Sequence, residues 1–585
     1  MTAPTWNLDT IFPGGSEGAP FTDALKVAEE GVEELVRRGD ALPDLPDDLD
    51  RWVHFLVDQD RFVRKAWQVA TFAHCVTCAD TADRNAARIA SRADAVFSRF
   101  GRAWVGPEDG IANASDEAYS QLRSRPELAY MGAYLDRVRR NRRLLLPRPE
   151  QALLRELSED GIRGWGQLYD RVSGQLQVEL DGEKTGVTQA VNQLGSTDAT
   201  ERVSALAALD TAWKGTEDEC AQALSHIIGW RQSLNDRRGV DELADTLARN
   251  RLTRKTLDAM FEASERAQPL LHKYMATKAG LIGKDFGWED LAAPLPAKDS
   301  KQDWPSAEAF VLEHFHTYHP ELADFARDAF AGRWIEAEDR NNKRPGGWCA
   351  NVPMTGESRI FMTHGGTFRS TVTLAHELGH AYHNWVMRDL LPSQRAITST
   401  LAETASVFAE SLVRDAALKA ADTREARLSM LDARLMAGVS FLMNIPARYH
   451  FERALYPLRR KGIFDPDELS ELMVDCQKRA YGDVLSSWYP RFWASKLHFY
   501  ISGFAFYNYP YTFGYLFAQL VYRKVRADGD HDAYVALLRR TGWDDSEPLA
   551  RDTLGLDLED PDTWWIAIEG LSEDLDAFVA EAHGS

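Results

Sequence analysis

Two histidines and a glutamate stand together in the stretch HELGH, with a spacing that suits metal-dependent hydrolysis. His376 and His380 are four residues apart, and Glu377 directly follows the first histidine. On an α-helix, residues four apart lie about 40° apart around the axis, so both imidazoles can reach one metal ion. Glu377 is rotated by about 100°, which leaves its carboxylate beside the metal, where it can take a proton from bound water. The alternative is an ordinary amphipathic helix with two satisfied histidines.

A catalytic zinc also needs a third protein ligand and an open fourth position. The longer pattern that would supply a third histidine is absent, because Val386 occupies its place. A glutamate from the next helix is the other common solution, and Glu403 in TSTLAETASV is the candidate. The alternative for Glu403 is a capping box with Thr400, in which it only closes the start of its helix. Glu410, on nearly the same helical face, is expected to support the site or to lie on the surface.

Zinc suits this set of donors. It accepts imidazole and carboxylate ligands and lowers the pKa of bound water to roughly 7. Cobalt and manganese are alternatives, but the order of affinities and the expected geometry favour zinc. We expect one Zn²⁺ per chain.

The composition of the chain excludes several classes of function. The net charge is −21 over 585 residues, which argues against nucleic acid and against an anionic membrane surface as partners. The stretch from Leu497 to Tyr522 is uncharged and long enough to span a bilayer, but its tyrosines, Asn508 and Gln519 would be costly in lipid. Five scattered cysteines and a start without an apolar core favour a reducing compartment, the cytoplasm.

Most of the sequence has the pattern of amphipathic helices, with apolar positions three and four residues apart. The stretch GQLQVELDGEKTGV instead alternates around Asp181-Gly182, which predicts a β-hairpin near residues 175–190. We place a soft domain boundary after it. An N-terminal helical region, 1–195, then precedes a larger catalytic region, 196–585. The stretch SRIFMTH, before the HELGH helix, predicts a short strand. The expected fold is mainly α with a small β element near the site.

Two further groups of potential metal ligands are expected to have other roles. Cys75 and Cys78 form a CxxC pair inside a helical pattern, and no second pair completes a zinc site, so we expect them in the core. His383 follows on the HELGH helix, and we expect a packed or solvent-facing side chain rather than a ligand.

Several stretches of the chain resemble one known family. LAHELGHAYH followed by LAETASVFAE resembles the M3 family of zinc metallopeptidases, the group of thimet oligopeptidase and oligoendopeptidase F. The stretches TWNLDTIFPG, VELDGE and FYNYPYTFGYLFAQ are similar to the oligoendopeptidase F branch. The similarity runs over nearly the whole chain, and the two motifs around the candidate metal site are its most specific parts.

The resemblance implies a ligand set and a fold. His376, His380 and Glu403 would bind zinc, and Glu377 would act as general base and then as general acid. The body would be a mostly helical, two-lobed metallopeptidase of the zincin type with a deep central channel. Such a channel admits short unfolded peptides and excludes folded proteins.

The family also places a histidine and tyrosines from a late segment over the substrate carbonyl. Here His498 and Tyr507 are the candidates for catalysis, and Tyr511 and Tyr515 are the candidates for substrate binding. The three tyrosines share a helical face by their four-residue spacing, and the alternative for each is packing in an aromatic core. His364, after the predicted strand, is a candidate for contact with substrate, and a structural role is equally open.

We therefore expect a zinc endopeptidase that hydrolyses internal bonds of short unfolded oligopeptides by Glu-assisted attack of a zinc-bound water. An extended peptide could add to the strand SRIFMTHGG, which reads main chain and gives broad specificity. The alternatives are a zinc hydrolase of another amide substrate and a catalytically silent helical peptide-binding protein. We expect oligopeptides as partners, no nucleic acid, no membrane, and a monomer or small homo-oligomer.

Overall fold

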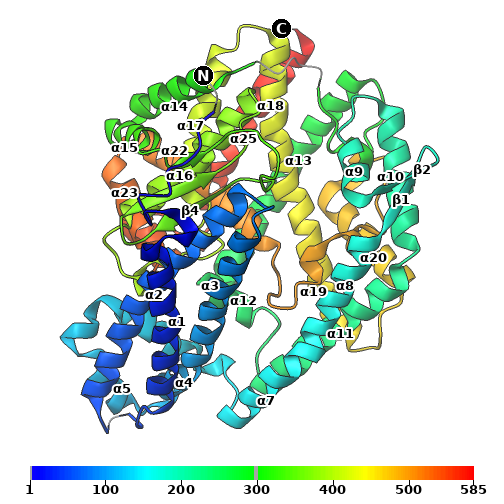
Figure 1. The fold of residues 1–585 in the computed structure, drawn as a ribbon. Coiled ribbons are helices and arrows are strands. Elements are labelled where there is room, and N and C mark those ends of the chain that lie inside the picture. The colour runs from blue at the N-terminus through cyan, green and yellow to red at the C-terminus, as the bar shows by residue number, and fades with distance from the viewer. Residues whose placement is uncertain (1–2, 46, 296–300, 585) are drawn as a thin grey trace. The chain divides into compact units, whose positions relative to one another are not determined.

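The computed structural model describes residues 3–45, 47–295 and 301–584, and most of them lie in helices (Figure 1). The chain divides into two compact units, each built from three separate stretches. Unit 1 contains Met1–Arg142, Asp299–Ala417 and Val521–Gly555, and unit 2 contains Arg143–Lys298, Leu418–Leu520 and Leu556–Ser585. The predicted mainly α fold with small β elements is confirmed. The boundary predicted at residue 195 falls inside unit 2 and stays a prediction, as does the central channel.

Unit 1 contains helices from all three of its stretches and a small sheet. The first stretch forms α1 (Ala19–Asp40), α2 (Leu49–Ala79), α3 (Arg84–Ala103), α4 (Val105–Asn113), α5 (Asp116–Arg123) and α6 (Gly132–Arg140). The second forms α14 (Trp304–Tyr318), α15 (Pro320–Ala331), β3 (Ile335–Glu336), β4 (Trp348–Val352), β5 (Glu357–Phe361), α16 (Phe368–Val386) and α17 (Thr404–Ala420). The third contains the end of α22 (Tyr509–Asp528), α23 (His531–Arg540) and α24 (Ser546–Leu554).

The sheet of unit 1 has the strand order β3-β5-β4. β5 pairs in parallel with β3 and antiparallel with β4, whose ends match as Trp348 with Phe361 and Val352 with Glu357. The strand predicted at SRIFMTH is therefore the central one, with neighbours on both sides. The edge strand β4 was missed by the sequence pattern, because WCANV follows a Gly-rich stretch and shows no clear alternation.

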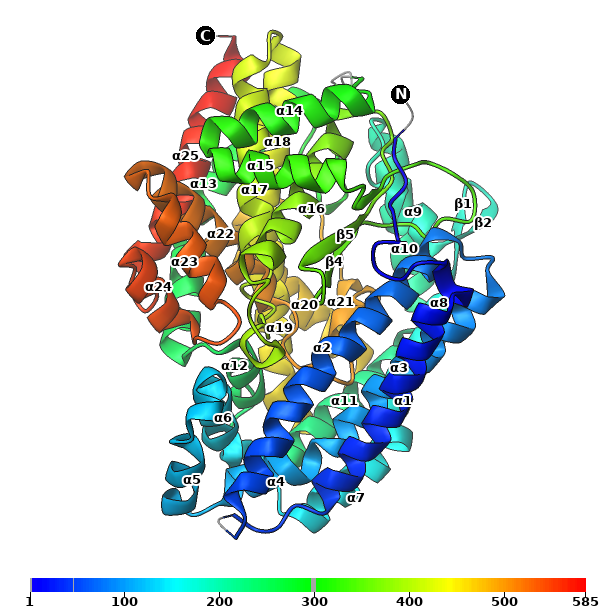
Figure 2. The same ribbon diagram turned by 60° about the vertical axis from the view of Figure 1, so that its left-hand side comes forward.

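The helices α1, α2 and α3 run side by side (Figure 2), and α2 contacts β4. Their buried apolar positions form one cluster that includes Phe21 of α1, Phe72 of α2, Ile89 of α3 and Val352 of β4. The hydroxyl of Thr71 on α2 also donates to the backbone carbonyl of Asn351 at 3.0 Å. These contacts fix the position of β4, which borders the candidate metal site.

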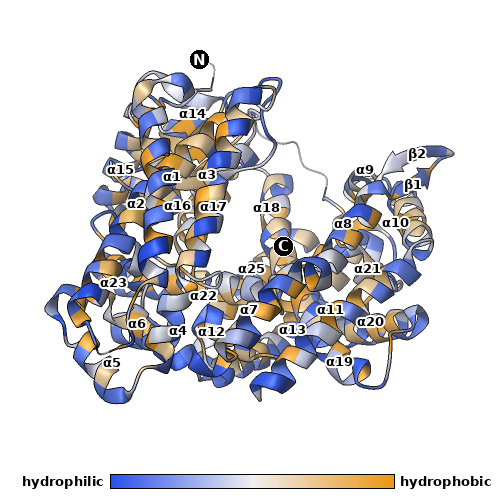
Figure 3. Ribbon diagram, turned by 60° about the horizontal axis from the view of Figure 1, so that its bottom comes forward, coloured by the Kyte–Doolittle hydropathy of each residue, from blue (hydrophilic) through white to orange (hydrophobic). Residues whose placement is uncertain are grey.

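Unit 2 is also helical. Its helices are α7 (Arg148–Ser158), α8 (Gly164–Gln175), α9 (Val187–Gln193), α10 (Ala199–Lys214), α11 (Glu217–Arg238), α12 (Ala244–Asn250), α13 (Arg254–Ile282), α18 (Arg424–Val439), α19 (Ile445–Arg459), α20 (Pro466–Tyr481), α21 (Phe492–Ser495), the start of α22, and α25 (Pro561–His583). Hydrophilic and hydrophobic residues alternate along helices such as α11, α13 and α20 (Figure 3). In the core of unit 2, α25 packs against α13 and α18.

The structure has a hairpin at Asp181-Gly182. β1 (Gln177–Leu180) and β2 (Glu183–Gly186) form an antiparallel pair. Both turn residues have positive φ, 51° for Asp181 and 83° for Gly182. Asp-Gly suits a two-residue turn of this kind because glycine adopts positive φ without steric cost.

One stretch of the described residues, Arg424–Arg459, is long and apolar enough to pass a test for a membrane-spanning helix, and half of its most apolar window is buried in the protein. Core helices of water-soluble proteins pass the same test.

Candidate metal centre

The helix α16 carries the HELGH motif. It starts after Gly366, whose φ of 70° turns the chain, and the hydroxyl of Thr367 accepts the backbone N–H of Ser370 at its N-terminus. The helix then continues without interruption to Val386. A regular helix across the motif places His376 and His380 on the same side, one turn apart.

A glycine inside the motif lets the next helix approach. A Cβ atom on Gly379 would lie 2.4 Å from the backbone oxygen of Ala405 and 2.6 Å from Cα of Ser406. Both atoms belong to the first turn of α17, so the backbones of α16 and α17 meet at this point. Sequence analysis did not single out this residue, although a glycine within a helical pattern is a known signal of close packing.

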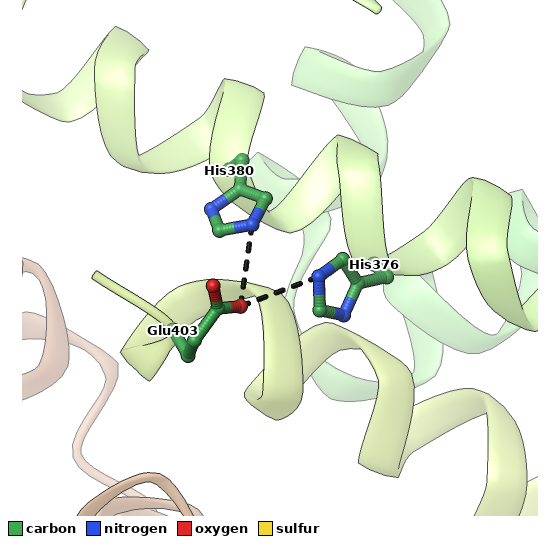
Figure 4. A group of neighbouring side chains, drawn as sticks. All are labelled: His376, His380 and Glu403. Carbon is green, nitrogen blue, oxygen red and sulfur yellow. Dashed lines mark ion pairs between the residues drawn. The ribbon is translucent and has the colours of Figure 1, made fainter. Parts of the chain in front are cut away.

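The approach of α17 brings Glu403 to both histidines (Figure 4). Its Oε2 atom is 3.3 Å from Nε2 of His376 and 3.3 Å from Nε2 of His380. The ligand atoms of the three residues all lie within 4.8 Å of one another, and each side chain is only partly buried. Two imidazoles and one carboxylate with an open side form a donor set that fits a zinc ion.

Glu403 stands just before α17, which begins at Thr404. Its backbone carbonyl accepts the N–H of Val407, and its side chain accepts the hydroxyl of Ser406 at 2.7 Å. Glu403 therefore occupies the residue before the first helical turn, while its carboxylate faces the histidines of α16 rather than lying free.

The pKa values of His376 and Glu403 shift in opposite directions, because the protonated imidazole and the ionised carboxylate stabilise each other. Burial lowers the pKa of His376, but its contacts with Glu403 and Glu410 raise it to about 10. Burial raises the pKa of Glu403, but the two histidines hold that pKa far below its usual range. A metal ion that binds here must displace the proton on the imidazole, so binding releases protons.

A second carboxylate lies behind His376. Oε2 of Glu410 is 3.2 Å from Nδ1 of His376, and Nε of Arg414 donates to Oε1 of Glu410 at 2.6 Å. A carboxylate at Nδ1 fixes the imidazole so that Nε2 stays directed to Glu403. Glu410 thus lies in a supporting position, one of the two alternatives that the sequence left open.

The carboxylate of Glu377 has a different environment. The residue is 5 % exposed, and its Oε2 atom is buried without a hydrogen-bond partner among the described residues. Burial raises the pKa of Glu377, and the histidines beside it act in the opposite direction. Gly347, at the edge of the sheet, leaves room for this carboxylate, because a Cβ there would lie 3.1 Å from Oε1. A buried carboxylate without a partner is suited to taking up a proton.

These residues line a pocket of about 390 Å³ within unit 1. Gly347, Trp348 and Cys349 of the β4 region form one wall, opposite the motif of α16. His383 also borders the pocket, but its Nε2 donates to the backbone oxygen of Leu538 at 3.1 Å, and burial lowers its pKa to about 3. His383 is thus a packed, neutral histidine, and it lies outside the group of three donors.

The late candidates lie in unit 2 and approach one another there. The ring centre of His498 is 5.4 Å from that of Tyr507 and 5.7 Å from that of Tyr511. The prediction that three tyrosines share one helical face is wrong for Tyr507, because α22 begins only at Tyr509. Tyr515 lies on α22, and its ring stacks on that of Phe441 with the ring centres 4.7 Å apart. The proposed roles of these residues stay predictions.

His364 and the CxxC pair lie away from the pocket lining. His364 is 8 % exposed, packs edge-on against Trp304, and accepts the N–H of Gly366 on Nδ1. Its contact with substrate stays a prediction. Cys75 and Cys78 are fully buried in an apolar cluster with Trp6 and Phe361, as expected for core residues.

Two parts of the chain match models of known protein families. Residues 297–568 match the model described as Peptidase family M3, and residues 111–177 match the model described as Oligopeptidase F. The first match contains the candidate metal centre and the late candidates, His498 and the tyrosines.

The similarity to some known proteins covers nearly the whole chain. Oligopeptidase PepF of Bacillus subtilis is 23% identical over 598 residues, which cover 98% of this chain and 86% of that protein. The oligoendopeptidase F homolog of Lactococcus lactis is 22% identical over 89% of this chain and 87% of its own. Among solved structures, oligoendopeptidase-F from Enterococcus faecium superimposes with a TM-score of 0.69 at 18% identity, covering 97% of this chain and 99% of its own. A protein from Chlamydophila abortus gives 0.84 at 19% identity, covering 99% and 100%.

Proposed function

Because the chain belongs to peptidase family M3 and is a metalloendopeptidase of the oligoendopeptidase F type, we propose that it cleaves internal bonds of short unfolded peptides with a zinc ion held by His376, His380 and Glu403. The observation that carries the proposal is the juxtaposition of this donor set with the buried Oε2 atom of Glu377, which has no hydrogen-bond partner among the described residues. Zinc bound by these residues would supply Lewis acidity and lower the pKa of water to roughly 7.

Glu377 has the properties of the proton carrier in this reaction. Its buried Oε2 is free to accept a proton from the attacking water and to return it to the leaving amine. Its burial favours the protonated form and raises its pKa, which strengthens the carboxylate as an acceptor of the proton from water. The absence of a side chain at Gly347 leaves room for this carboxylate.

His498 is suited to stabilise the negative charge that develops on the carbonyl oxygen. The guanidinium of Arg448 can only donate, and its Nη1 is 3.3 Å from Nδ1 of His498. Nδ1 must therefore accept, and Nε2 carries the hydrogen. Burial first, and then the neighbouring cations Arg448 and Lys496, lower the pKa of His498 to about 4. The imidazole is thus a neutral donor, and we propose that it acts on the transition state together with Tyr507.

The edge strand β4 is the better candidate for pairing with an extended peptide. β5, for which the sequence suggested this role, has strands on both sides. β4 is at the edge, and its first residues Trp348 and Cys349 border the pocket. Main-chain pairing there would bind peptides of many sequences. We infer a broad specificity, with Tyr511 and Tyr515 as further substrate contacts.

The surroundings of the enzyme follow from its chemistry and charge. We propose oligopeptides as its substrates and the cytoplasm as its location, since a similar protein is named an oligopeptidase and the five cysteines form no disulfide among the described residues. The net charge of −21 supports neither nucleic acid nor an anionic membrane as a partner.

The Glu377→Gln variant tests the division of roles. We expect it to retain one zinc per chain and to lose turnover of an internally quenched peptide of about eight residues by about 10²–10⁴-fold. Metal content by elemental analysis and kcat measure the two outcomes, with the exposed Glu313→Gln of α14 as control. Loss of zinc together with turnover would contradict the role of Glu377 as a proton carrier. Glu403→Ala should lose both.

A hydrolase of another amide substrate is the alternative function. Mass spectrometry of products from a peptide mixture distinguishes the two. Internal cleavage of peptides in a limited range of lengths supports the proposal, whereas inertness toward every peptide with zinc bound supports the alternative.

A further inference from the structure

Two cationic side chains of unit 2, Arg448 and Lys496, lie together and have no acidic partner in the described part of the chain. The guanidinium carbon of Arg448 on α19 is 5.1 Å from the centre of the Phe492 ring. The ammonium nitrogen of Lys496 is 4.6 Å from the same ring centre. Both charges thus lie against one aromatic ring, next to His498. Among the described residues, no carboxylate forms an ion pair with either cation.

The acidic residue one helical turn after Arg448 contacts other groups instead. Glu452 follows Arg448 by one turn of α19, a spacing at which ion pairs form readily. Its Oε1 instead accepts the backbone N–H of Phe506 at 2.6 Å, and it lies 3.6 Å from Nη1 of Arg231. Glu452 is therefore directed toward a different arginine.

Two other buried cations of unit 2 have close counter-ions. Nζ of Lys278 is 2.9 Å from Asp432, and Nη2 of Arg202 is 2.7 Å from Asp290. Burial without a counter-ion is costly, and two adjacent like charges add repulsion. Burial and the neighbouring guanidinium lower the pKa of Lys496 to about 7, in keeping with this environment. A bound anion would relieve both effects.

We propose that Arg448 and Lys496 bind a carboxylate of the peptide substrate, namely its C-terminal carboxylate. This inference rests on the proposed function. Arginine presents paired N–H groups that match a carboxylate, and lysine adds a compact charge. Both residues are partly accessible, and their neighbours Leu497 and Tyr511 are 50 % and 39 % exposed.

The position of this site sets the length of the product. One extended residue spans about 3.5 Å, and Arg448 contacts the imidazole that we place at the scissile carbonyl. A carboxylate bound here therefore lies one or a few residues beyond the cleaved bond. Peptides that end shortly after that bond should be preferred.

The test compares two quenched peptides of one sequence, the first with a free C-terminal carboxylate and the second with a C-terminal carboxamide. We expect wild type to cleave the acid with a kcat/KM at least about 10-fold higher, as a charge-assisted pair provides. The preference should disappear in Lys496→Met and in Arg448→Met, and Lys496→Arg should retain most of it. Lys461→Met, an exposed lysine of the same unit, is the matched control and should keep the preference.

The outcomes separate the inference from the proposed function. Equal cleavage of both peptides by wild type, or a preference that survives in Lys496→Met, overturns the inference. A second pair of peptides, both amidated and differing only by Glu or Gln after the cleaved bond, shows whether a side-chain carboxylate is bound instead, which would overturn the C-terminal assignment. If wild type cleaves no peptide, the proposed function fails. Fluorescence anisotropy of labelled acid and amide peptides on the Glu377→Gln protein then still decides whether the cationic site exists.

Discussion

Three glutamates near the two histidines differ in the surroundings of their carboxylates. Glu403 faces Nε2 of both histidines, Glu410 faces Nδ1 of one of them, and Glu377 has an oxygen without a partner. The same side chain can therefore be a candidate ligand, a support or a proton carrier. The environment assigns the role, because it decides which carboxylate is free to change its proton.

At the residue scale, we predict that Glu410 increases zinc affinity without binding zinc. Glu410→Ala removes the acceptor at Nδ1 of His376 and frees the imidazole to rotate. We expect zinc affinity to fall about 10–100-fold, measured by competition with a chromogenic chelator. Glu410→Gln, which keeps an acceptor oxygen, should lose less, and Glu313→Ala should lose nothing. Equal zinc affinity of wild type and Glu410→Ala would show that Glu410 is only a surface charge.

At the element scale, Gly379 determines how closely α16 and α17 approach. In Gly379→Ala the new Cβ collides with the backbone at Ala405, so α17 must move away and carry Glu403 with it. We expect a loss of stability of about 1–3 kcal/mol and a zinc affinity reduced at least about 10-fold. Thermal unfolding and chelator competition measure the two effects.

The control for this change is a glycine with free space. Gly101 lies within α3, and a Cβ there meets nothing within 4 Å, so Gly101→Ala should leave zinc affinity unchanged. A Gly379→Ala protein with wild-type zinc affinity would mean that α17 can shift without moving Glu403.

At the element scale, the small sheet shows which features can be predicted from the local sequence pattern and which cannot. The stretch SRIFMTH predicts a short strand, and β5 confirms it. Its place in the centre of the sheet was not predictable, because it depends on β3 and β4, two earlier segments that pair with β5 on opposite sides. We therefore propose that the peptide substrate pairs with β4 and not with β5.

At the scale of the whole molecule, a buried carboxyl in unit 2 connects stability to pH. Glu452 is 1 % exposed. It accepts the backbone N–H of Phe506, whose φ is 54°, and it lies near the guanidinium of Arg231. Burial raises the pKa of Glu452 to about 7, and Arg231 acts against this rise. In the unfolded chain a glutamate titrates near its ordinary value of about 4.3.

We predict that this group destabilises the protein as pH rises. Between about pH 4.3 and 7 the unfolded chain releases the proton while the folded protein keeps it, so the contribution of Glu452 to stability is present at low pH and lost by pH 7. The full effect is on the order of 3 kcal/mol. Thermal midpoints of wild type and Glu452→Gln at pH 5 and pH 8 measure it.

Comparison with the variant cancels the titration of all other groups. Wild type should lose stability relative to Glu452→Gln on going from pH 5 to pH 8. The same comparison with Glu262→Gln, an exposed position on α13, should show no change with pH. A constant difference between wild type and Glu452→Gln would mean that Arg231 keeps Glu452 ionised throughout.

The sequence by itself determined the features that depend on neighbours along the chain. The pairing of His376 with His380 follows from helix geometry, and the hairpin at Asp181-Gly182 follows from turn chemistry. The mainly α fold follows from a repeated spacing of apolar residues. Each of these signals lies within a few residues, so no knowledge of distant contacts is needed.

Only the tertiary structure decided the features that join distant segments. It placed Glu403 against both histidines through the close approach at Gly379, and it left Glu377 unpartnered beside Gly347. It also paired Glu452 with Arg231, which left Arg448 without a counter-ion. These outcomes depend on which backbones can approach and which charges find partners, and packing between elements settles both.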